Sequence, residues 1–228
     1  MKKALLIFFL AAYTTIAFSQ STSSKFRFGV KAQPALAWFR IDAPNGTDVK
    51  SDGLPFGFGY GLITDFGFTD RYSFSTGLEV AYRGGRTLYN YKVTSGSTTT
   101  TTTIKTKYSL QFVELPLTLK LRTNEIGYMT YYFQVGVAPG YAIRSRAEIK
   151  VNDVVIDSKK DVSSDINEFN LSMIIGAGAE YNISGSTSLL FGLTFNNGFL
   201  DVLDDSPYNG AAVKGNSNYL SLTVGILF

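Results

Sequence analysis

The sequence predicts an all-β protein: a transmembrane, antiparallel, up-and-down β-barrel of about eight strands, preceded by a cleavable signal peptide. Three observations predict this fold. Apolar and polar residues alternate with period two through eight segments, and the connections between the segments alternate in length. Beyond the N-terminus, no apolar run reaches the ~20 residues that a membrane helix needs. The alternation matters most, because neighbouring residues of a strand face opposite sides of its sheet.

The first 19 residues are predicted to be a secretory signal peptide. Lys2 and Lys3 form a positive start, residues 4–12 are apolar, and Ala17 and Ser19 place small residues before a cleavage site at Gln20. We therefore expect one barrel domain over residues 20–228. Removal of Lys2 and Lys3 leaves 19 basic and 18 acidic residues, a balance that gives no reason to expect a nucleic-acid partner.

Eight segments have the alternation and roughly the ~10 residues of a tilted membrane strand. They are residues 26–38, 56–68, 72–83, 110–121, 131–138, 169–181, 188–195 and 219–228. In the first four segments, the residues predicted to face lipid include Phe26, Phe28, Val30, Leu36, Trp38, Phe56, Phe58, Tyr60, Leu62, Phe66, Leu78, Tyr82, Leu115, Leu117 and Leu119. In the last four they include Tyr131, Phe133, Val135, Val137, Phe169, Leu171, Ile175, Leu189, Phe191, Leu193, Leu220, Leu222, Val224, Ile226 and Phe228.

The final segment ends on an aromatic residue, Phe228, on the lipid-facing side. This ending resembles the C-terminal signal that the barrel-assembly machinery of bacterial outer membranes reads. Trp38 and the tyrosines near strand ends suit the aromatic girdles found at the two membrane interfaces. These tyrosines are Tyr72, Tyr82, Tyr128, Tyr131 and Tyr181.

The connections predict the orientation of the barrel in the cell outer membrane. Short connections lie near 69–71, 122–127 and 182–186, and long ones near 40–54, 92–107, 144–167 and 197–217. Outer-membrane barrels have short periplasmic turns and long external loops. We therefore expect a multi-pass protein with extracellular loops and both termini in the periplasm.

A soluble eight-stranded barrel of the lipocalin type is the structural alternative. Its large apolar residues would point inward, whereas here the small residues Gly and Ser share a face with the polar ones and suit a tight lumen. The membrane barrel is the better interpretation. Pro34 and Pro116 interrupt the pattern, because proline lacks the N–H of a ladder bond, and each is expected to mark a bulge or a strand end.

The composition excludes several classes of function. The chain contains no cysteine and no histidine, which rules out disulfides, thiol catalysis, zinc sites built on these residues and any catalytic triad that uses histidine as its base. No cofactor, no metal site and no enzymatic activity are expected.

The alternation places eight charged residues in the lumen. They are Arg27, Lys31, Asp65, Glu79, Arg83, Glu114, Lys120 and Glu180, four basic and four acidic. Charges in a narrow barrel must pair or stay hydrated, so the favoured interpretation is a salt-bridge network that fills the lumen. The alternatives are a narrow polar path and, least favoured, catalysis by carboxylates.

Other motifs have weaker functional interpretations. Gly57, Gly59 and Gly61 lack the GK[ST] and the helix of a phosphate loop. Asp201, Asp204 and Asp205 lack the spacing of a calcium loop and are expected in a solvated loop. The run Thr98–Thr103 predicts a mobile external loop or an extended hairpin.

The third long connection carries both signs of charge. Its basic residues are Arg144, Arg146, Lys150, Lys159 and Lys160. They would suit lipopolysaccharide, but Glu148, Asp153, Asp157, Asp161 and Asp165 lie among them. A mixed, solvated loop is therefore the preferred interpretation.

Two motifs carry a family resemblance. Residues 112–120, FVELPLTLK, resemble the E-[LI]-P-L-x-L-K segment of the PorT-like outer-membrane β-barrel family of Bacteroidetes, and residues 176–181, GAGAEY, resemble its G-x-G-x-E-Y strand. The resemblance spans nearly the whole mature chain. It implies a Gram-negative outer-membrane barrel, and the namesake of the family is implicated in secretion and gliding machinery.

Three functions remain open at this point. The first is a structural or interaction barrel that works through its external loops, with outer-membrane lipid, lipopolysaccharide and an unidentified protein as partners. The second is a porin-like channel for ions or small solutes. The third, by family analogy alone, is a component of a secretion or gliding apparatus. The first is favoured, because eight strands enclose a lumen that side chains can fill.

Overall fold

The computed structural model describes residues 26–43, 48–95, 98–208 and 211–228; the side chains of 93–99 and 204–212 are also left undescribed. The signal peptide predicted at 1–19 lies outside these ranges. The strands are β1 (Phe26–Asp42), β2 (Val49–Ser51), β3 (Phe56–Gly67), β4 (Tyr72–Ser95), β5 (Thr98–Glu114), β6 (Leu117–Arg122), β7 (Met129–Val151), β8 (Val154–Asp161), β9 (Phe169–Ser184), β10 (Thr187–Tyr208) and β11 (Ala211–Leu227). A short 3-10 helix, η2 (Ser163–Asp165), lies between β8 and β9.

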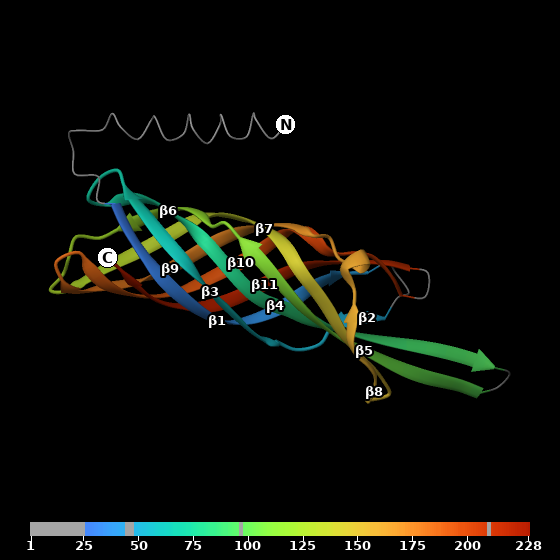
Figure 1. Cartoon of the computed structure of the whole chain (residues 1–228). Coiled ribbons are helices and arrows are strands. Elements are labelled where there is room, and N and C mark those ends of the chain that lie inside the picture. The colour runs from blue at the N-terminus through green and yellow to red at the C-terminus, as the bar shows by residue number, and fades with distance from the viewer. Residues whose placement is uncertain (1–25, 44–47, 96–97, 209–210) are drawn as a thin grey trace, which may run out of the picture.

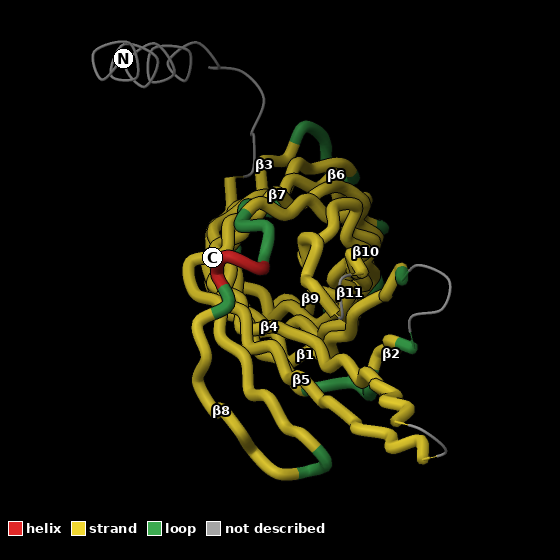
Figure 2. Tube along the Cα trace, turned by 90° about the vertical axis from the view of Figure 1, so that its right-hand side faces the viewer, coloured by secondary structure: helices red, strands yellow, loops and turns green. Residues whose placement is uncertain are grey.

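The strands close into a barrel, because β1 pairs antiparallel with both β3 and β11. Around the ring the order is β1, β3, β4, then β5 together with β6, then β7, β9, β10 and β11. β5 and β6 follow one another along the chain, and both lie between β4 and β7, so together they form one strand of the barrel. The wall therefore consists of eight strands, as predicted. Figures 1 and 2 show the closed ring and the hairpins that project from one end of it. Among the described residues, no helix is long and apolar enough to cross a membrane.

The two ends of the barrel differ. The turn end carries the start of β1, the end of β11 and the short turns, and Phe28 and Phe228 exchange backbone hydrogen bonds there. The hairpin end carries the extensions of β4–β5, β7–β8 and β10–β11 (Figure 1). The prediction that the long connections are loops is therefore wrong about their local structure. Most of 92–107, 144–161 and 197–217 is strand, with β4 reaching 24 residues and β7 reaching 23.

The predicted faces of the strands are confirmed. Large apolar side chains cover the outside of the ring; those more than 40% exposed include Phe26, Phe28, Val30, Phe56, Leu62, Leu78, Phe133, Phe191, Leu193 and Leu222. The fold therefore has an apolar outer band, as a membrane requires, and the lipocalin alternative is wrong. The predicted girdle tyrosines, Tyr72, Tyr82, Tyr128, Tyr131 and Tyr181, are all more than 40% exposed.

The two prolines differ in effect. Pro116 separates β5 from β6, so it does mark a strand end. Pro34 lies within β1 opposite Phe58, and the β1–β11 register is the same on both sides of it. The bulge or strand end expected at Pro34 is therefore wrong: the strand continues, and the pairing with β11 is interrupted only at Gln33 and Pro34.

Candidate functional site

The lumen is the candidate functional site, because its middle holds charged side chains that burial would normally exclude. The structure brings all eight lumen residues singled out by the sequence into two ion-pair clusters. Each arises because inward positions alternate along β1, β3, β4, β5, β6 and β9, and neighbouring strands align these positions.

The first cluster lies nearer the turn end and centres on Asp65. The Asp65 carboxylate is fully buried and lies 2.8 Å from Lys120 Nζ and 3.0 Å from Arg27 Nη2. Glu180 lies 2.8 Å from Arg27 Nη1 and 3.3 Å from Lys120. The two carboxylates therefore share both cations, so that loss of one cation leaves each acid with another.

Sequence reasoning missed one member of this cluster, Arg122. Its guanidinium lies 3.4 Å from Asp65 and donates a 2.8 Å hydrogen bond to Ser73. The sequence interpretation placed Arg122 in a turn, whereas it ends β6. It is two residues from Lys120, so extending the alternation by one step would have found it.

The second cluster lies farther along the axis and centres on Arg83, whose side chain is 2% exposed. Arg83 Nη1 lies 2.6 Å from both carboxylate oxygens of Glu114, and its Nη2 lies 2.7 Å from Glu79. Lys31 pairs with the other oxygen of Glu79 at 2.8 Å. Glu114 also accepts a 3.2 Å hydrogen bond from the Tyr219 hydroxyl.

Neutral side chains complete the second cluster. The Arg83 guanidinium lies 3.4 Å from the centre of the Tyr219 ring, an arrangement that favours a buried cation. With its nitrogen toward Glu79, the Gln33 amide donates to both carboxylate oxygens, at 2.5 and 2.7 Å, and accepts from Thr223 at 2.9 Å. Sequence alternation places these residues on the inward face but does not indicate their contacts.

Inward glycines make room for these large groups. A Cβ on Gly59 would lie 2.6 Å from a carboxylate oxygen of Glu79, and one on Gly192 would collide with the Tyr132 hydroxyl. Gly57, Gly59 and Gly61 all lie in β3, on the inward face of a strand and not in a phosphate loop. Their small size therefore permits a filled lumen.

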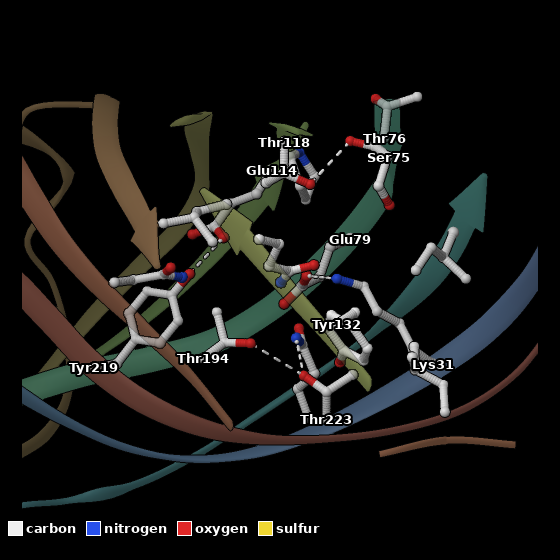
Figure 3. A pocket seen from close by; sticks show the side chains of 17 residues that line it. Lys31, Ser75, Thr76, Glu79, Glu114, Thr118, Tyr132, Thr194, Tyr219 and Thr223 are labelled. Carbon is white, nitrogen blue, oxygen red and sulfur yellow. Dashed lines mark hydrogen bonds and ion pairs between the residues drawn. The ribbon is translucent and has the colours of Figure 1, made fainter. Parts of the chain in front are cut away.

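Little free space remains between the clusters. A cavity of about 30 Å³ lies beside Lys31, Glu79, Glu114, Tyr132 and Tyr219 (Figure 3). That volume holds one or two water molecules. On the turn-end side of Arg27, Arg122 and Glu180, a larger vestibule of about 610 Å³ opens.

An apolar cluster, which we call the apolar plug, lies inside the hairpin end, and the sequence analysis did not predict it. Val162 and Ile166, from the segment around η2, pack with Val202 and Leu203 of β10 and with inward residues of the wall. The wall residues are Phe39, Tyr108, Leu110, Phe112, Ala142 and Ala147, all at most 7% exposed. Backbone hydrogen bonds from Asn167 to Val202 and from Ala142 to Glu168 hold the segment in place. In Figure 2, η2 lies within the outline of the ring.

The remaining sequence motifs lie in strands of the hairpin end. Among the described residues, no group of three or more acidic, histidine or cysteine side chains is arranged to hold a metal. Asp201 lies in β10 and not in a loop, while the side chains of Asp204 and Asp205 are outside the described part. The threonine run forms the start of β5, opposite the end of β4, as an extended hairpin.

A search of the curated proteins found no match. Among solved structures, the chain is similar to neisserial surface protein A from Neisseria, with TM-score 0.47 and 15% identity over 91% of this chain and 98% of that one. It is also similar to the attachment invasion locus protein Ail of Yersinia pestis, with TM-score 0.39 and 15% identity over 89% and 98% of the chains. The chain is also similar to OprG from Pseudomonas aeruginosa, with TM-score 0.43 and 12% identity over 90% of this chain and 97% of that one.

The family assignment comes from a sequence match. The model of the family described as outer membrane protein beta-barrel domain matches residues 18–204, well over half of the chain. The match includes both ion-pair clusters except Tyr219 and Thr223, together with the plug. The chain therefore belongs to the outer membrane protein β-barrel domain family.

Proposed function

We propose that this outer-membrane barrel is closed to ions and solutes, has no enzymatic activity and acts through the hairpins at one end, which bind a partner outside the cell. One observation carries the proposal: two different obstructions follow one another along the lumen. The charged clusters leave a cavity of only about 30 Å³, and the apolar plug follows toward the hairpin end. An ion would have to displace buried salt bridges and then cross a dry apolar layer.

The chemistry of the lumen supports a structural role over a catalytic one. Each of the four buried carboxylates is held by at least one cation within 3.0 Å, so none is positioned as an unpaired general base. The buried groups also link strands that are far apart around the ring. Arg27 of β1 contacts Glu180 of β9, three strands away, and Tyr219 of β11 donates a hydrogen bond to Glu114 of β5, on the opposite side. The network thus ties opposite parts of the wall together.

The orientation is part of the proposal. The hairpin end would face the cell exterior and the turn end the periplasm, because bacterial barrels have short periplasmic turns and longer external connections. Phe228 would serve as the recognition signal for the barrel-assembly machinery. This residue is 42% exposed on the outer surface, where another protein could reach it, and its ring centroid lies 5.6 Å from that of Phe28.

We likewise propose that the chain belongs to the PorT-like subgroup of Bacteroidetes. The contacts in the structure indicate what the residues of the motif do. In residues 114–120, Glu114 binds Arg83, Pro116 separates β5 from β6, and Lys120 binds Asp65. The motif therefore contains one member of each ion-pair cluster and the break between them. A place in a secretion or gliding apparatus rests on the resemblance alone, and capture of periplasmic or external partners would test it.

Single-channel conductance in a planar bilayer tests the proposal. We expect no openings from refolded wild-type protein whose folding is verified by heat-shifted gel mobility. A positive control replaces Arg83, Lys120 and Tyr219 in the charged clusters and Val162, Ile166 and Leu203 in the apolar plug with serine. It widens both obstructions of the lumen without changing the outer surface. Reproducible wild-type openings of defined size would overturn the closed barrel and establish the channel alternative. The 610 Å³ vestibule at the turn end is the observation that favours that alternative.

A further inference from the structure

The outer surface just beyond the apolar band carries a group of basic residues on β4, β5 and β7. Strand pairing aligns them in rows across the wall: Tyr82, Gln111 and Arg144 in one row, then Gly84, Ser109 and Arg146, then Arg86, Lys107 and Glu148. All of these positions lie on the outer face of the wall, the face on which Tyr82 and, nearer the turn end, Tyr141 are exposed. The sequence interpretation of 144–151 as part of a mixed, solvated loop is therefore wrong, since β7 fixes Arg144 and Arg146 against the barrel wall.

Three of these cations border one hollow. Lys107, Arg144 and Arg146 line a surface pocket of about 240 Å³, together with Phe56, Tyr82, Ser109 and Gln111. We call it the basic pocket. No acidic residue lines it among the residues that the structure describes. None of the three cations makes an ion pair within 4.0 Å in the described part of the chain, in contrast to Lys105 and Lys150, which pair with Asp153 and Glu148.

Three carboxylates lie around these cations, and each has another partner. Glu148, opposite Lys107, pairs with Lys150 at 3.3 Å. Asp161 accepts hydrogen bonds from the backbone N–H and the hydroxyl of Ser163, and Glu168 accepts one from the Tyr141 hydroxyl. Both acids border a separate hollow on the other side of Arg144 and Arg146. Arg146 interacts electrostatically with Asp161 but does not form an ion pair with it. The basic pocket thus keeps a local excess of positive charge.

The depth of the pocket indicates what could enter it. Successive rows are two residues apart, about 6.6 Å along a strand and about 5 Å along the membrane normal for a tilted strand. The apolar band ends near Phe56, Tyr82 and Ile143, which are 73%, 43% and 52% exposed. The cations therefore lie within the first rows beyond the hydrocarbon boundary, at the level of lipid headgroups.

We propose that the basic pocket binds the phosphate group of an anionic membrane lipid. Lys107, Arg144 and Arg146 would donate charge-assisted hydrogen bonds to the phosphate oxygens, with the guanidinium groups suited to bidentate contact. Phe56 and Tyr82 would contact the start of the acyl chains. A lipid is the chosen occupant because it alone uses both walls of the pocket, the basic one and the apolar one that continues into the band. The proposal needs only that the band lies in a bilayer, so it stands or falls independently of whether the lumen conducts.

Native mass spectrometry of the full barrel released from nanodiscs tests the proposal. The nanodiscs contain phosphatidylcholine with a small fraction of diphosphorylated lipid A, or of the same lipid A after removal of its phosphates. We compare wild type with the triple variant Lys107→Gln, Arg144→Gln, Arg146→Gln. The matched control, Lys159→Gln, Lys160→Gln, Lys214→Gln, removes the same charge from exposed positions at the hairpin end, outside the basic pocket.

We expect wild type and control to retain phosphorylated lipid A, and the pocket variant to bind it about 100-fold more weakly. Dephosphorylated lipid A should bind all three proteins equally weakly. Equal retention by the pocket variant and wild type would overturn the proposal, as would equal binding of the dephosphorylated lipid. Competition by millimolar inorganic phosphate as effective as that by lipid A would show a free-anion site instead. Heat-shifted gel mobility verifies that each variant is folded.

Discussion

Replacement of Arg83 by methionine should be the most destabilising single change in the lumen. Arg83 is the only cation within 4.0 Å of the Glu114 carboxylate among the described residues, and it contributes both contacts of 2.6 Å. Its removal leaves Glu114 buried, 3% exposed, with only the Tyr219 hydroxyl as a hydrogen-bond partner among the described residues. Breaking a buried pair by deleting one partner costs about 3–5 kcal/mol, since the desolvated charge that remains is uncompensated.

The comparison with Lys120→Met sharpens this prediction. Lys120 is also fully buried, but Asp65 keeps Arg27 and Arg122, and Glu180 keeps Arg27. We therefore expect a smaller loss, about 1–3 kcal/mol. The order of the two losses tests the idea that shared counter-ions protect the first cluster, whereas Glu114 in the second cluster depends on Arg83 alone.

Urea unfolding in lipid vesicles measures both losses. Trp38, the single tryptophan, is half-buried and stacks on Phe195 at 6.2 Å, so its fluorescence reports on the wall. The double variant Arg83→Met, Glu114→Leu should recover much of the stability, because an apolar pair replaces an ion pair at little cost. Midpoints for R83M and K120M that both equal the wild-type value would refute the assignment of the network to barrel stability.

Three further predictions concern single contacts. Tyr219→Phe should cost about 1–3 kcal/mol in the same unfolding assay, since Glu114 loses a hydrogen bond and retains Arg83; no change would mean that water replaces the hydroxyl. Gly192→Ala should lower the free energy of unfolding by about 1–3 kcal/mol, because the new methyl group collides with the Tyr132 hydroxyl. Adding Tyr132→Phe should restore the lost stability, and failure of this rescue would place the strain in the backbone. Asp153 should titrate below its ordinary pKa, because Lys105 donates a 2.6 Å hydrogen bond to it. Because the pKa of Asp153 is lowered in the folded state, the stabilising contact is present at neutral pH and is lost as the pH falls through that pKa. The carboxyl NMR shifts of Asp153 in wild type and in Lys105→Gln measure the pKa. Identical titration curves for the two proteins would contradict the contact.

Period-two alternation predicted the wall of the barrel well. Outward Phe26, Leu62 and Leu193 and inward Asp65 and Glu79 follow from the geometry of a strand and from the preference of each face for lipid or for a crowded interior. The alternation also placed the eight lumen charges on one side of the wall. It could not pair them, because pairing depends on the stagger between strands, which a single sequence does not contain.

The hairpin end could not be predicted to the same extent. Polar and charged residues in 92–107 and 144–161 have the composition of loops, yet pairing with a neighbouring strand extends them as hairpins. The plug gave no periodic signal, because Val162 and Ile166 come from an irregular segment and are buried only through contacts with distant strands. The basic pocket also needed the structure, since Lys107 and Arg146 are 39 positions apart and meet through the pairing of β5 with β7.

In the closed barrel that we propose, the lumen can be reached from one end only. The vestibule of about 610 Å³ lies at the turn end, whereas Val162, Ile166, Val202 and Leu203 pack together inside the hairpin end. In such a barrel, ionic strength and pH on the turn side would reach Arg27, Arg122 and Glu180 directly, whereas conditions on the hairpin side would not. The wall would then span the membrane while the interior shares the solution conditions of one compartment.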